Sequence, residues 1–280
     1  MNKPLVSVIC LCFNHSKFVE EAIRSVQDQT YPNVELIILD DHSEDQSVEV
    51  IQRILPRLTN AKFIPIQNNL GNCRAFNKGL EVASGEFIID LSADDVLLPE
   101  RIEEGVTAFQ NASVDAGVNF CDAELINAEG KSLGRHSDRF PHNSIPQGDI
   151  YAAILRKYFI NSPTMMMKRM VFDRLGGYDE SLAYEDFDFL VRSSRQFKFI
   201  YTPEVLLKRR ILSTSLGSHQ YKRGSRQLES TFKICEKAFL LNRTDEEYSA
   251  LKMRIRYELR QALLLGDIKL ALNYFRLLLR

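Results

Sequence analysis

The sequence predicts an α/β protein with a doubly wound, mostly parallel sheet and a C-terminal helical extension. Two observations support this prediction. Short runs of β-branched and aliphatic residues alternate with helical patterns through the first hundred residues, which is the order of repeated β-α-β units. Beyond about residue 220 only helical spacing remains, so we expect a sheet domain over residues 1–219 and a helical region over 220–280.

Four strands and the helices between them are expected in the first hundred residues. The strands are the apolar runs at residues 6–12, 34–39, 62–66 and 86–91. Ser16 is expected to cap the first helix, and Ser43 with Gln46 to form a capping box for the second. Gly85 is expected to end the third helix, and a fourth begins near Pro99.

The middle of the chain is less regular. Residues 116–121 have the pattern of a strand, and residues 124–127 and 131–134 flank turn residues as in a hairpin. Residues 135–148 form a polar loop that we expect to overhang a site. Near the C-terminus, Thr244 and Glu247 are spaced as a capping box.

Composition excludes several classes of protein. The chain has 36 Lys and Arg residues against 37 Asp and Glu, which argues against a nucleic-acid binder. Its five cysteines are scattered without a Cys-x-x-Cys pair, so a reducing, cytoplasmic location is expected. No run of eighteen apolar residues predicts a transmembrane helix. No glycine-rich dinucleotide loop or P-loop lysine motif supports a dehydrogenase, kinase or ATPase.

Polar and acidic residues follow three of the expected strands. The first strand leads into Phe13-Asn14, the second ends at Asp40-Asp41, and the fourth is followed by Asp94-Asp95. Ligands bind at the carboxyl ends of strands in doubly wound sheets. Two acidic pairs there repel each other unless a cation lies between them, and Mg²⁺ or Mn²⁺ carrying a nucleoside diphosphate fits that need. Alternatively, each pair only caps the helix that follows it.

Four segments carry a resemblance to a known family. They are VSVICLCFN (6–14), SVQDQTYPNVELIILDDHSEDQS (25–47), NLGNCRAFNKGLEVASGEFIIDLSADD (69–95) and GGYDESLAYEDFDFLVR (176–192). Their order and spacing over roughly residues 5–215 resemble the family 2 glycosyltransferases, enzymes of the GT-A fold that use nucleotide sugars. The resemblance implies this fold and sugar transfer from a nucleotide-sugar donor.

The resemblance also implies roles for individual residues around the nucleotide. Phe13 would lie beside the base with Asn14 next to it, and Asp41 would accept a hydrogen bond from the imide N–H of uracil or thymine. The family's common Ala-Arg-Asn reads Ala-Phe-Asn here. Arg74, three residues before Asn77 and so on the same helical face, is expected to supply the missing cation.

Three further carboxylates take implied roles. Asp94 would face the ribose or the donor sugar, Asp95 would bind Mn²⁺ or Mg²⁺, and Asp186 matches the general base. The first Asp of the family's acidic motif is replaced by Ser92, which leaves fewer carboxylates for the metal. The histidine that the family often carries after the last strand is absent at Leu212, and His219 is a weaker substitute.

Less specific interpretations apply to several of these features. Cys10 and Cys12 point to one strand face and are expected in the core, as are Met165–Met167. Glu185 and Asp188 flank the expected base, and their alternative role is that of a solvated acidic first helical turn.

The sequence therefore predicts an inverting glycosyltransferase that moves a sugar from a UDP-sugar, or less favourably a dTDP-sugar, to a hydroxyl of a glycan or lipid-linked glycan in cell-surface polysaccharide synthesis. Two other classes remain open. A nucleotidyltransferase shares the sheet and the metal but needs a basic glycine-rich loop after its first strand, where Phe13-Asn14-His15 stands. A non-catalytic nucleotide-sugar or glycan binder would not need both the acidic pair and the Glu-Asp motif.

The last thirty residues are basic and leucine-rich. Residues 251–280 hold seven cations against Glu258 and Asp267, namely Lys252, Arg254, Arg256, Arg260, Lys269, Arg276 and Arg280. One interpretation is an amphipathic region that lies peripherally on the inner face of an anionic cell membrane. The other is that its leucines pack onto the catalytic domain or a second subunit.

Overall fold

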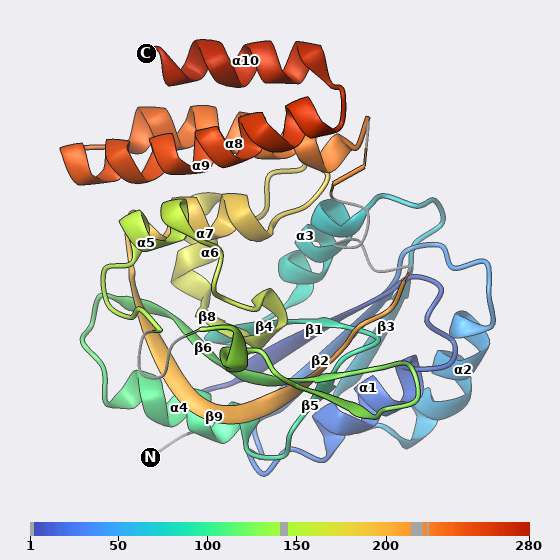
Figure 1. Ribbon diagram of the computed structural model, residues 1–280. Helices are drawn as coiled ribbons and strands as arrows, with labels where there is room; N and C mark the ends of the chain where they lie inside the picture. Colours follow the sequence, from blue (N-terminus) through green and yellow to red (C-terminus); the bar gives the residue numbers. More distant parts are fainter. Residues whose placement is uncertain (1–2, 141–144, 214–220, 223) are drawn as a thin grey trace.

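The computed structural model describes residues 3–140, 145–213, 221–222 and 224–280. One curved sheet lies at the centre with helices on both of its faces, and the C-terminal helices are stacked above one helical layer (Figure 1). The predicted α/β fold class with a C-terminal helical extension is confirmed.

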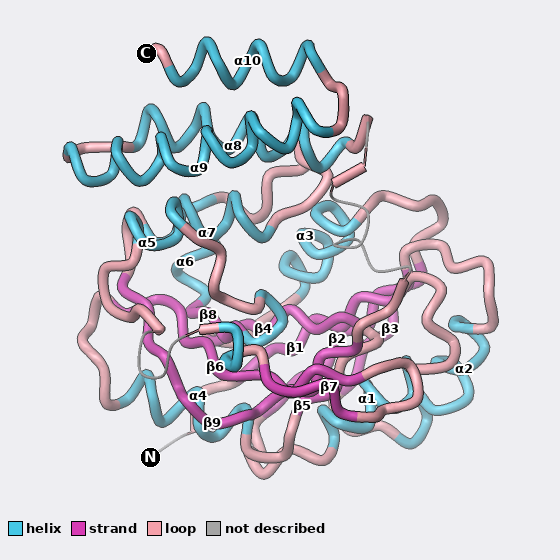
Figure 2. The backbone as a smooth tube through the Cα atoms, viewed as in Figure 1, coloured by secondary structure: helices cyan, strands magenta, loops and turns pink. Residues whose placement is uncertain are grey.

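Nine strands form this sheet in the described ranges, in the order β3-β2-β1-β4-β8-β6-β9-β5, with β7 paired to β6. The strands are β1 Val6–Cys12, β2 Val34–Asp40, β3 Ala61–Pro65, β4 Phe87–Ser92, β5 Val96–Leu97, β6 Ala116–Ile126, β7 Ser132–Arg135, β8 Met165–Lys168 and β9 Lys198–Arg210. The first four strands are parallel, as is the β6–β9 pair, whereas β8 joins β4 and β6 in the antiparallel direction. Figure 2 shows the strands as one layer between the helices.

The helices cover both faces because the buried strands are apolar on both sides. The helices are α1 Val19–Gln27, α2 Ser47–Ile54, α3 Asn72–Val82, α4 Arg101–Gln110, α5 Tyr151–Arg156, α6 Arg169–Leu175, α7 Asp186–Ser194, α8 Arg226–Leu241, α9 Asp245–Leu264 and α10 Ile268–Leu278. Along β1, Val8 and Cys10 belong to the core under α1, α2 and α4, whereas Ile9 and Leu11 belong to the core under α3 and α5–α10.

Two of the predicted helix caps are wrong, because the loops after β1 and β2 use those side chains to hold each other. Helix α1 begins only after Phe18, and the backbone N–H of Ser16 donates to Asp45 instead. Helix α2 begins at Ser47, and the Ser43 hydroxyl donates to Asp40 at 2.6 Å. The predicted capping box of Thr244 and Glu247 is present at the start of α9.

The loop and hairpin predictions have mixed outcomes. Strands β6 and β7 form the expected hairpin around residues 127–131. Residues 141–144 of the predicted polar loop lie outside the described residues, and no described residue of 135–148 lines the cavity presented below. No helix in the described ranges is long and apolar enough to cross a lipid bilayer.

The C-terminal helices share the core of the sheet domain. Buried side chains of α8, α9 and α10 belong to the same apolar cluster as those of α3, α5, α6 and α7. The hydroxyl of Tyr151 in α5 donates to Asn242 at 2.9 Å, and Arg195 forms an ion pair with Glu247 at 2.7 Å. The helical extension is therefore anchored to the helices that follow β6.

Candidate active site

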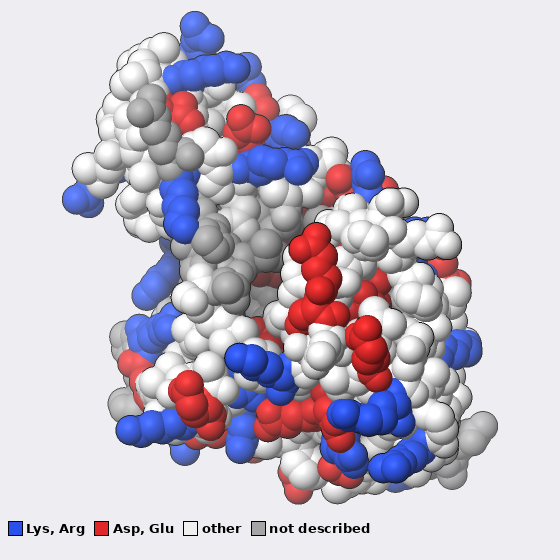
Figure 3. Space-filling view, turned by 90° about the vertical axis from the view of Figure 1, so that its right-hand side faces the viewer, with Lys and Arg blue, Asp and Glu red and all other residues white. Residues whose placement is uncertain are grey.

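A cavity of about 590 Å³ opens at the carboxyl ends of β1, β2 and β4 and continues to the C-terminal helices. In Figure 3 the molecule is hollowed between the helical extension and the sheet domain, and acidic side chains gather on the sheet-domain side. Five of the seven site residues predicted from the sequence line this cavity: Phe13, Asp41, Asp94, Asp95 and Asp186. The fold thus brings together residues from positions 13 to 186.

One end of the cavity is formed by the loops after β1 and β2. Phe13 is 44% exposed and lies beyond the last residue of β1. Asp41 is almost buried, and its two carboxylate oxygens accept hydrogen bonds from the backbone N–H groups of Leu70 and Gly71 at 2.8 and 2.9 Å. Gly71 adopts a φ of +81°, which favours glycine and lets the chain turn around the carboxylate before α3.

Asn14 lies beside this end and serves the loops. It has a φ of +58°, its backbone N–H donates to Ser43, and its side-chain oxygen accepts from the backbone N–H of Glu44, both at 2.8 Å. Asn14 does not line the cavity in the described part of the chain. Its contacts fix the loop that presents Phe13.

Asp94 and Asp95 form the acidic wall. Asp95 is 2% exposed, and its Oδ1 accepts a hydrogen bond from the backbone N–H of Arg210 at 2.8 Å. The Asp94 carboxylate accepts from the hydroxyl of Ser92 at 2.5 Å and lies 3.9 Å from His15 Nε2. Burial, together with the charge of Asp94, raises the pKa of Asp95 well above its ordinary value.

These two carboxylates suit a divalent cation. Asp94 and Asp95 are adjacent in the chain and both line the cavity, while the described residues hold no group of three or more His, Cys, Asp or Glu side chains able to bind a metal ion. Among those residues none donates a hydrogen bond to Asp95 Oδ2. Mg²⁺ and similar ions bind through one or two carboxylates plus phosphate oxygens, and a cation would offset the burial and the Asp94 charge that together raise the pKa of Asp95.

Asp186 lies on another wall of the cavity, at the first position of α7. The hydroxyl of the half-buried Tyr158 donates to its Oδ2 at 3.2 Å, and Tyr158 also contacts Ser162. Tyr158 therefore holds the Asp186 carboxylate at the wall of the cavity.

Two other carboxyls accompany Asp186, and neither was assigned a catalytic or binding role from the sequence. Asp90 accepts from the hydroxyl of Tyr178 at 3.0 Å, and burial raises the pKa of Asp90 to about 7, with the Asp186 charge acting in the same direction. Burial and the charge of Asp186 likewise raise the pKa of Glu185. A carboxyl within the apolar run of β4 is the sequence signal that identifies Asp90.

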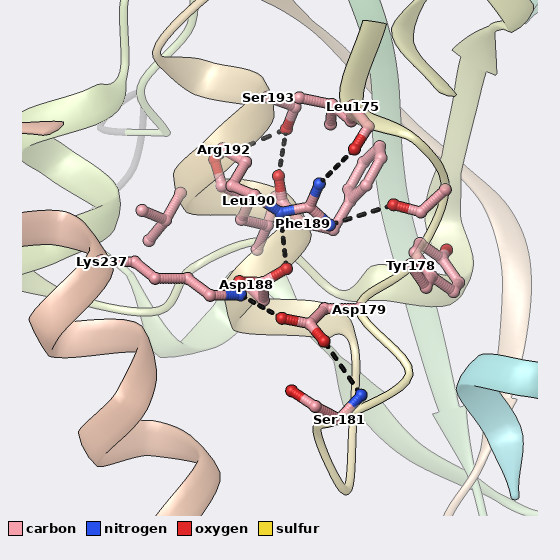
Figure 4. Close-up of polar contacts among 12 residues, drawn as sticks. Leu175, Tyr178, Asp179, Ser181, Asp188, Phe189, Leu190, Arg192, Ser193 and Lys237 are labelled. Carbon is pink, nitrogen blue, oxygen red and sulfur yellow. Dashed lines mark hydrogen bonds and ion pairs between the residues drawn. The ribbon is translucent and has the colours of Figure 1, made fainter. Parts of the chain in front are cut away.

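Glu185 and Asp188 are not a solvated first turn, and that interpretation is corrected. Asp188 is 1% exposed and forms ion pairs of 2.6 Å with Arg192 and with Lys237 of α8. Lys237 also contacts Asp179 at 2.5 Å (Figure 4). The lysine pairing holds the pKa of Asp179 at about 2 against the opposing effect of partial burial. This network clamps α7, and with it Asp186, to α8.

The expected cation Arg74 does not reach the cavity. Its side chain is 55% exposed and lies 3.5 Å from Glu180, because this position of α3 faces outward. Arg209 and Arg210 at the end of β9 line the cavity instead. Arg209 donates to Asn161 at 2.9 Å, while Arg210 is buried. Arg210 donates to the backbone oxygens of residues 94, 127 and 128, so it holds the acidic wall in place.

The remaining sequence expectations have simple outcomes. Cys10, Cys12 and Met165–Met167 are buried in the core, as expected, and Met165 also borders the cavity. His219 lies outside the described residues.

Comparisons with known proteins identify the family of this chain. The glycosyl transferase family 2 profile matches residues 7–176. An uncharacterised glycosyltransferase of Methanocaldococcus jannaschii is 31% identical over 215 residues, which cover 75% of this chain and 72% of the relative. TuaG of Bacillus subtilis, a glycosyltransferase assigned to teichuronic acid biosynthesis, is 26% identical over 79% of this chain and 84% of TuaG.

Solved structures share the fold. S. aureus TarS in complex with UDP-GlcNAc superposes with a TM-score of 0.70 at 18% identity, over 92% of this chain and 73% of TarS 1–349. The mannosyltransferase PcManGT of Pyrobaculum calidifontis, in complex with GDP-Man and Mn²⁺, gives a TM-score of 0.67 at 17% identity, over 99% of this chain and 74% of PcManGT. With the family profile over more than half of its length, this chain is a GT-A-type enzyme that belongs to glycosyl transferase family 2.

Proposed function

We propose that this enzyme moves a sugar from a UDP-sugar, with inversion, to a hydroxyl of a glycan or lipid-linked glycan in cell-surface polysaccharide synthesis. The observation that carries the proposal is that Asp41 beside Phe13, the pair Asp94–Asp95, and Asp186 line one cavity. UDP-GlcNAc bound to TarS and the pathway assigned to TuaG support the donor class and the setting. A dTDP-sugar is the second candidate donor.

In this proposal each residue acts on one part of the donor or acceptor. Asp41 accepts a hydrogen bond from the imide N–H of the base, and Phe13 lies against the base. Asp94 faces the ribose or the donor sugar. Asp95 holds Mn²⁺ or Mg²⁺, which when bound neutralises negative charge on the leaving diphosphate. Asp186 removes the proton of the incoming hydroxyl on the opposite face, so direct displacement inverts the anomeric centre.

A donor screen tests this proposal. With Mn²⁺ present, UDP-sugars should raise the midpoint of thermal unfolding more than dTDP- or GDP-sugars do. A ligand at a hundredfold excess over its Kd stabilises the folded state by about 2.7 kcal/mol. Selective stabilisation by a GDP-sugar would contradict the assigned base contact. Slow donor hydrolysis would separate a transferase from a mere binder, and pyrophosphate release would indicate a nucleotidyltransferase.

We propose in addition that the helical extension binds an anionic membrane surface from the cytoplasmic side. Helix α10 exposes large apolar side chains at i, i+4, i+7 and i+11, on the face opposite its buried residues; these are Ile268, Leu272, Phe275 and Leu279. Exposed cations accompany them, namely Lys252, Arg256, Arg260, Lys269, Arg276 and Arg280. Basic side chains spread over the upper part of the molecule in Figure 3. This combination complements acidic lipid headgroups.

Vesicle sedimentation tests the membrane proposal. The protein should co-sediment at low salt with vesicles of phosphatidylglycerol and phosphatidylcholine and be released at high salt, since each cation near the surface contributes about 1 kcal/mol. Leu272→Ser combined with Phe275→Ser should reduce binding by roughly tenfold or more. Val114→Ser, at a 90% exposed residue of the sheet domain, is the control. Protein that stays in the supernatant, or self-associates through α10 instead, would contradict the proposal.

A further inference from the structure

The cavity extends past Asp186 to a second wall supplied by the helical extension. Two of its residues, Tyr184 and Phe187, neighbour Asp186 in sequence. The others come from α8, α9 and the segment before α8, and they are Tyr221, Gln227, Thr231, Arg254 and Glu258. The hydroxyls of Tyr184 and Thr231 lie 2.7 Å apart. The carboxylate expected to act as base therefore lies between the acidic wall and this helical wall.

Arg254 and Glu258 form a buried ion pair in the helical wall. They are one turn apart on α9, and Arg254 Nη1 lies 3.4 Å from Glu258 Oε1. Glu258 is 1% exposed, and Arg254 Nε donates to the backbone oxygen of Leu155 at 3.3 Å. The Arg254 guanidinium also lies 4.9 Å from the centre of the Phe187 ring, beside Asp186. Neither residue belongs to the exposed surface of the extension, although both lie in the basic segment 251–280 of the sequence.

The hydroxyl of Tyr221 donates to Glu258 Oε1 at 3.3 Å, but two other polar atoms of the pair have no partner in the described part of the chain. Arg254 Nη2 and Glu258 Oε2 are buried and have no hydrogen-bond partner among the described residues. Leaving a charged donor and a charged acceptor unsatisfied in the interior is costly. Burial raises the pKa of Glu258, which reflects this cost. A group that both accepts from Arg254 and donates to Glu258 would satisfy the two atoms together.

We propose that this pair is the acceptor subsite and that it binds a hydroxyl-bearing, uncharged sugar. A sugar hydroxyl both accepts and donates, so the hydroxyls of one ring can serve Nη2 and Oε2. Because Arg254 is already paired with Glu258, the pair has no net positive charge to attract a carboxylated or phosphorylated sugar, and the Glu258 carboxylate repels it. The inference rests on the proposed function, because it places the acceptor next to the base Asp186. The helical extension thereby sets acceptor specificity.

Saturation-transfer NMR and titration with methyl glycosides test the proposal. The samples contain UDP and Mn²⁺ at saturating concentrations, and the probes are the neutral methyl β-glucoside, β-galactoside and N-acetyl-β-glucosaminide and the acidic methyl β-glucuronide. The wild type should bind at least one neutral glycoside and prefer it to the glucuronide. Glu258→Gln should weaken that binding by about tenfold or more. Glu229→Gln, an exposed change of the same chemistry on α8, should not alter it.

Controls separate the possible failures. Arg254→Lys keeps the charge but loses Nη2, and it replaces Glu258→Gln as the test if that variant does not fold. Equal glycoside affinity in the wild type and the pair variants would overturn the inference. Preference of the wild type for the glucuronide would also overturn it. So would a wild type that binds UDP but none of the neutral glycosides. If the wild type does not bind UDP with Mn²⁺, the proposed function fails first, and the inference fails with it.

Discussion

Asp186→Asn should fold, bind UDP with wild-type affinity and transfer sugar at least about a hundredfold more slowly, which is the usual scale of general-base catalysis. The amide can still accept the hydrogen bond from Tyr158 but cannot take a proton from the acceptor. Initial rates with the donor identified by the thermal screen measure the loss. Circular dichroism and UDP titration show that fold and donor site are intact.

The matched control for this variant is Asp173→Asn. Asp173 is exposed on α6 and lies outside the cavity, so the same chemical change there should leave turnover unchanged. Asp186→Asn with near-wild-type transfer would show that Asp186 only starts α7. Asp186→Glu keeps the carboxylate but displaces it. An intermediate turnover in this variant would support Asp186 as a proton acceptor whose position matters.

Asp95→Asn should abolish most of the contribution of Mn²⁺ to UDP binding. In Mn²⁺ the variant should bind UDP at least about tenfold more weakly than the wild type, because the cation loses its anionic ligand while the diphosphate charge remains. With the metal chelated, the two proteins should bind UDP equally. Isothermal titration calorimetry with and without EDTA measures the effect of Mn²⁺ on UDP affinity in each protein, and the two effects are then compared.

Asp173→Asn is again the control, with an unchanged response to Mn²⁺. Equal UDP affinity of wild type and Asp95→Asn in Mn²⁺ would show that Asp95 is not the metal ligand. A parallel loss in EDTA would instead indicate a structural role through the hydrogen bond from the Arg210 backbone.

Much of the sheet could be predicted from sequence because its strands are continuous apolar runs. The run at residues 6–12 coincides with β1, and the next three strands differ from their predicted bounds by about one residue. The helix starts after β1 and β2 could not be predicted in the same way. Ser16 and Ser43 are good local caps, but the two loops meet in space and Asp45 and Asp40 take up their polar groups.

Asp41, Asp94 and Asp95 follow strand ends and Asp186 stands in a segment that resembles the family, so these carboxylates could be identified, whereas several partners could not. Arg74 has the right spacing on α3, but its rotation about the helix is set by packing, and it points to Glu180. Asp188 and Arg254 are equally ambiguous, since charged side chains on a helix are usually solvated. Only the fold shows that Lys237 and Glu258 are their partners.

The clamp between α7 and α8 limits how such enzymes can be recombined. A chimera that joins the sheet domain of this chain to the helical extension of a relative removes Lys237 from Asp188 and Asp179 unless the donor supplies a cation at that place. Asp188 would then keep only Arg192, and a buried carboxylate would have lost half of its compensation. The natural crossover point therefore lies before α7, so that the segment bearing Asp186 is inherited together with the helices that brace it.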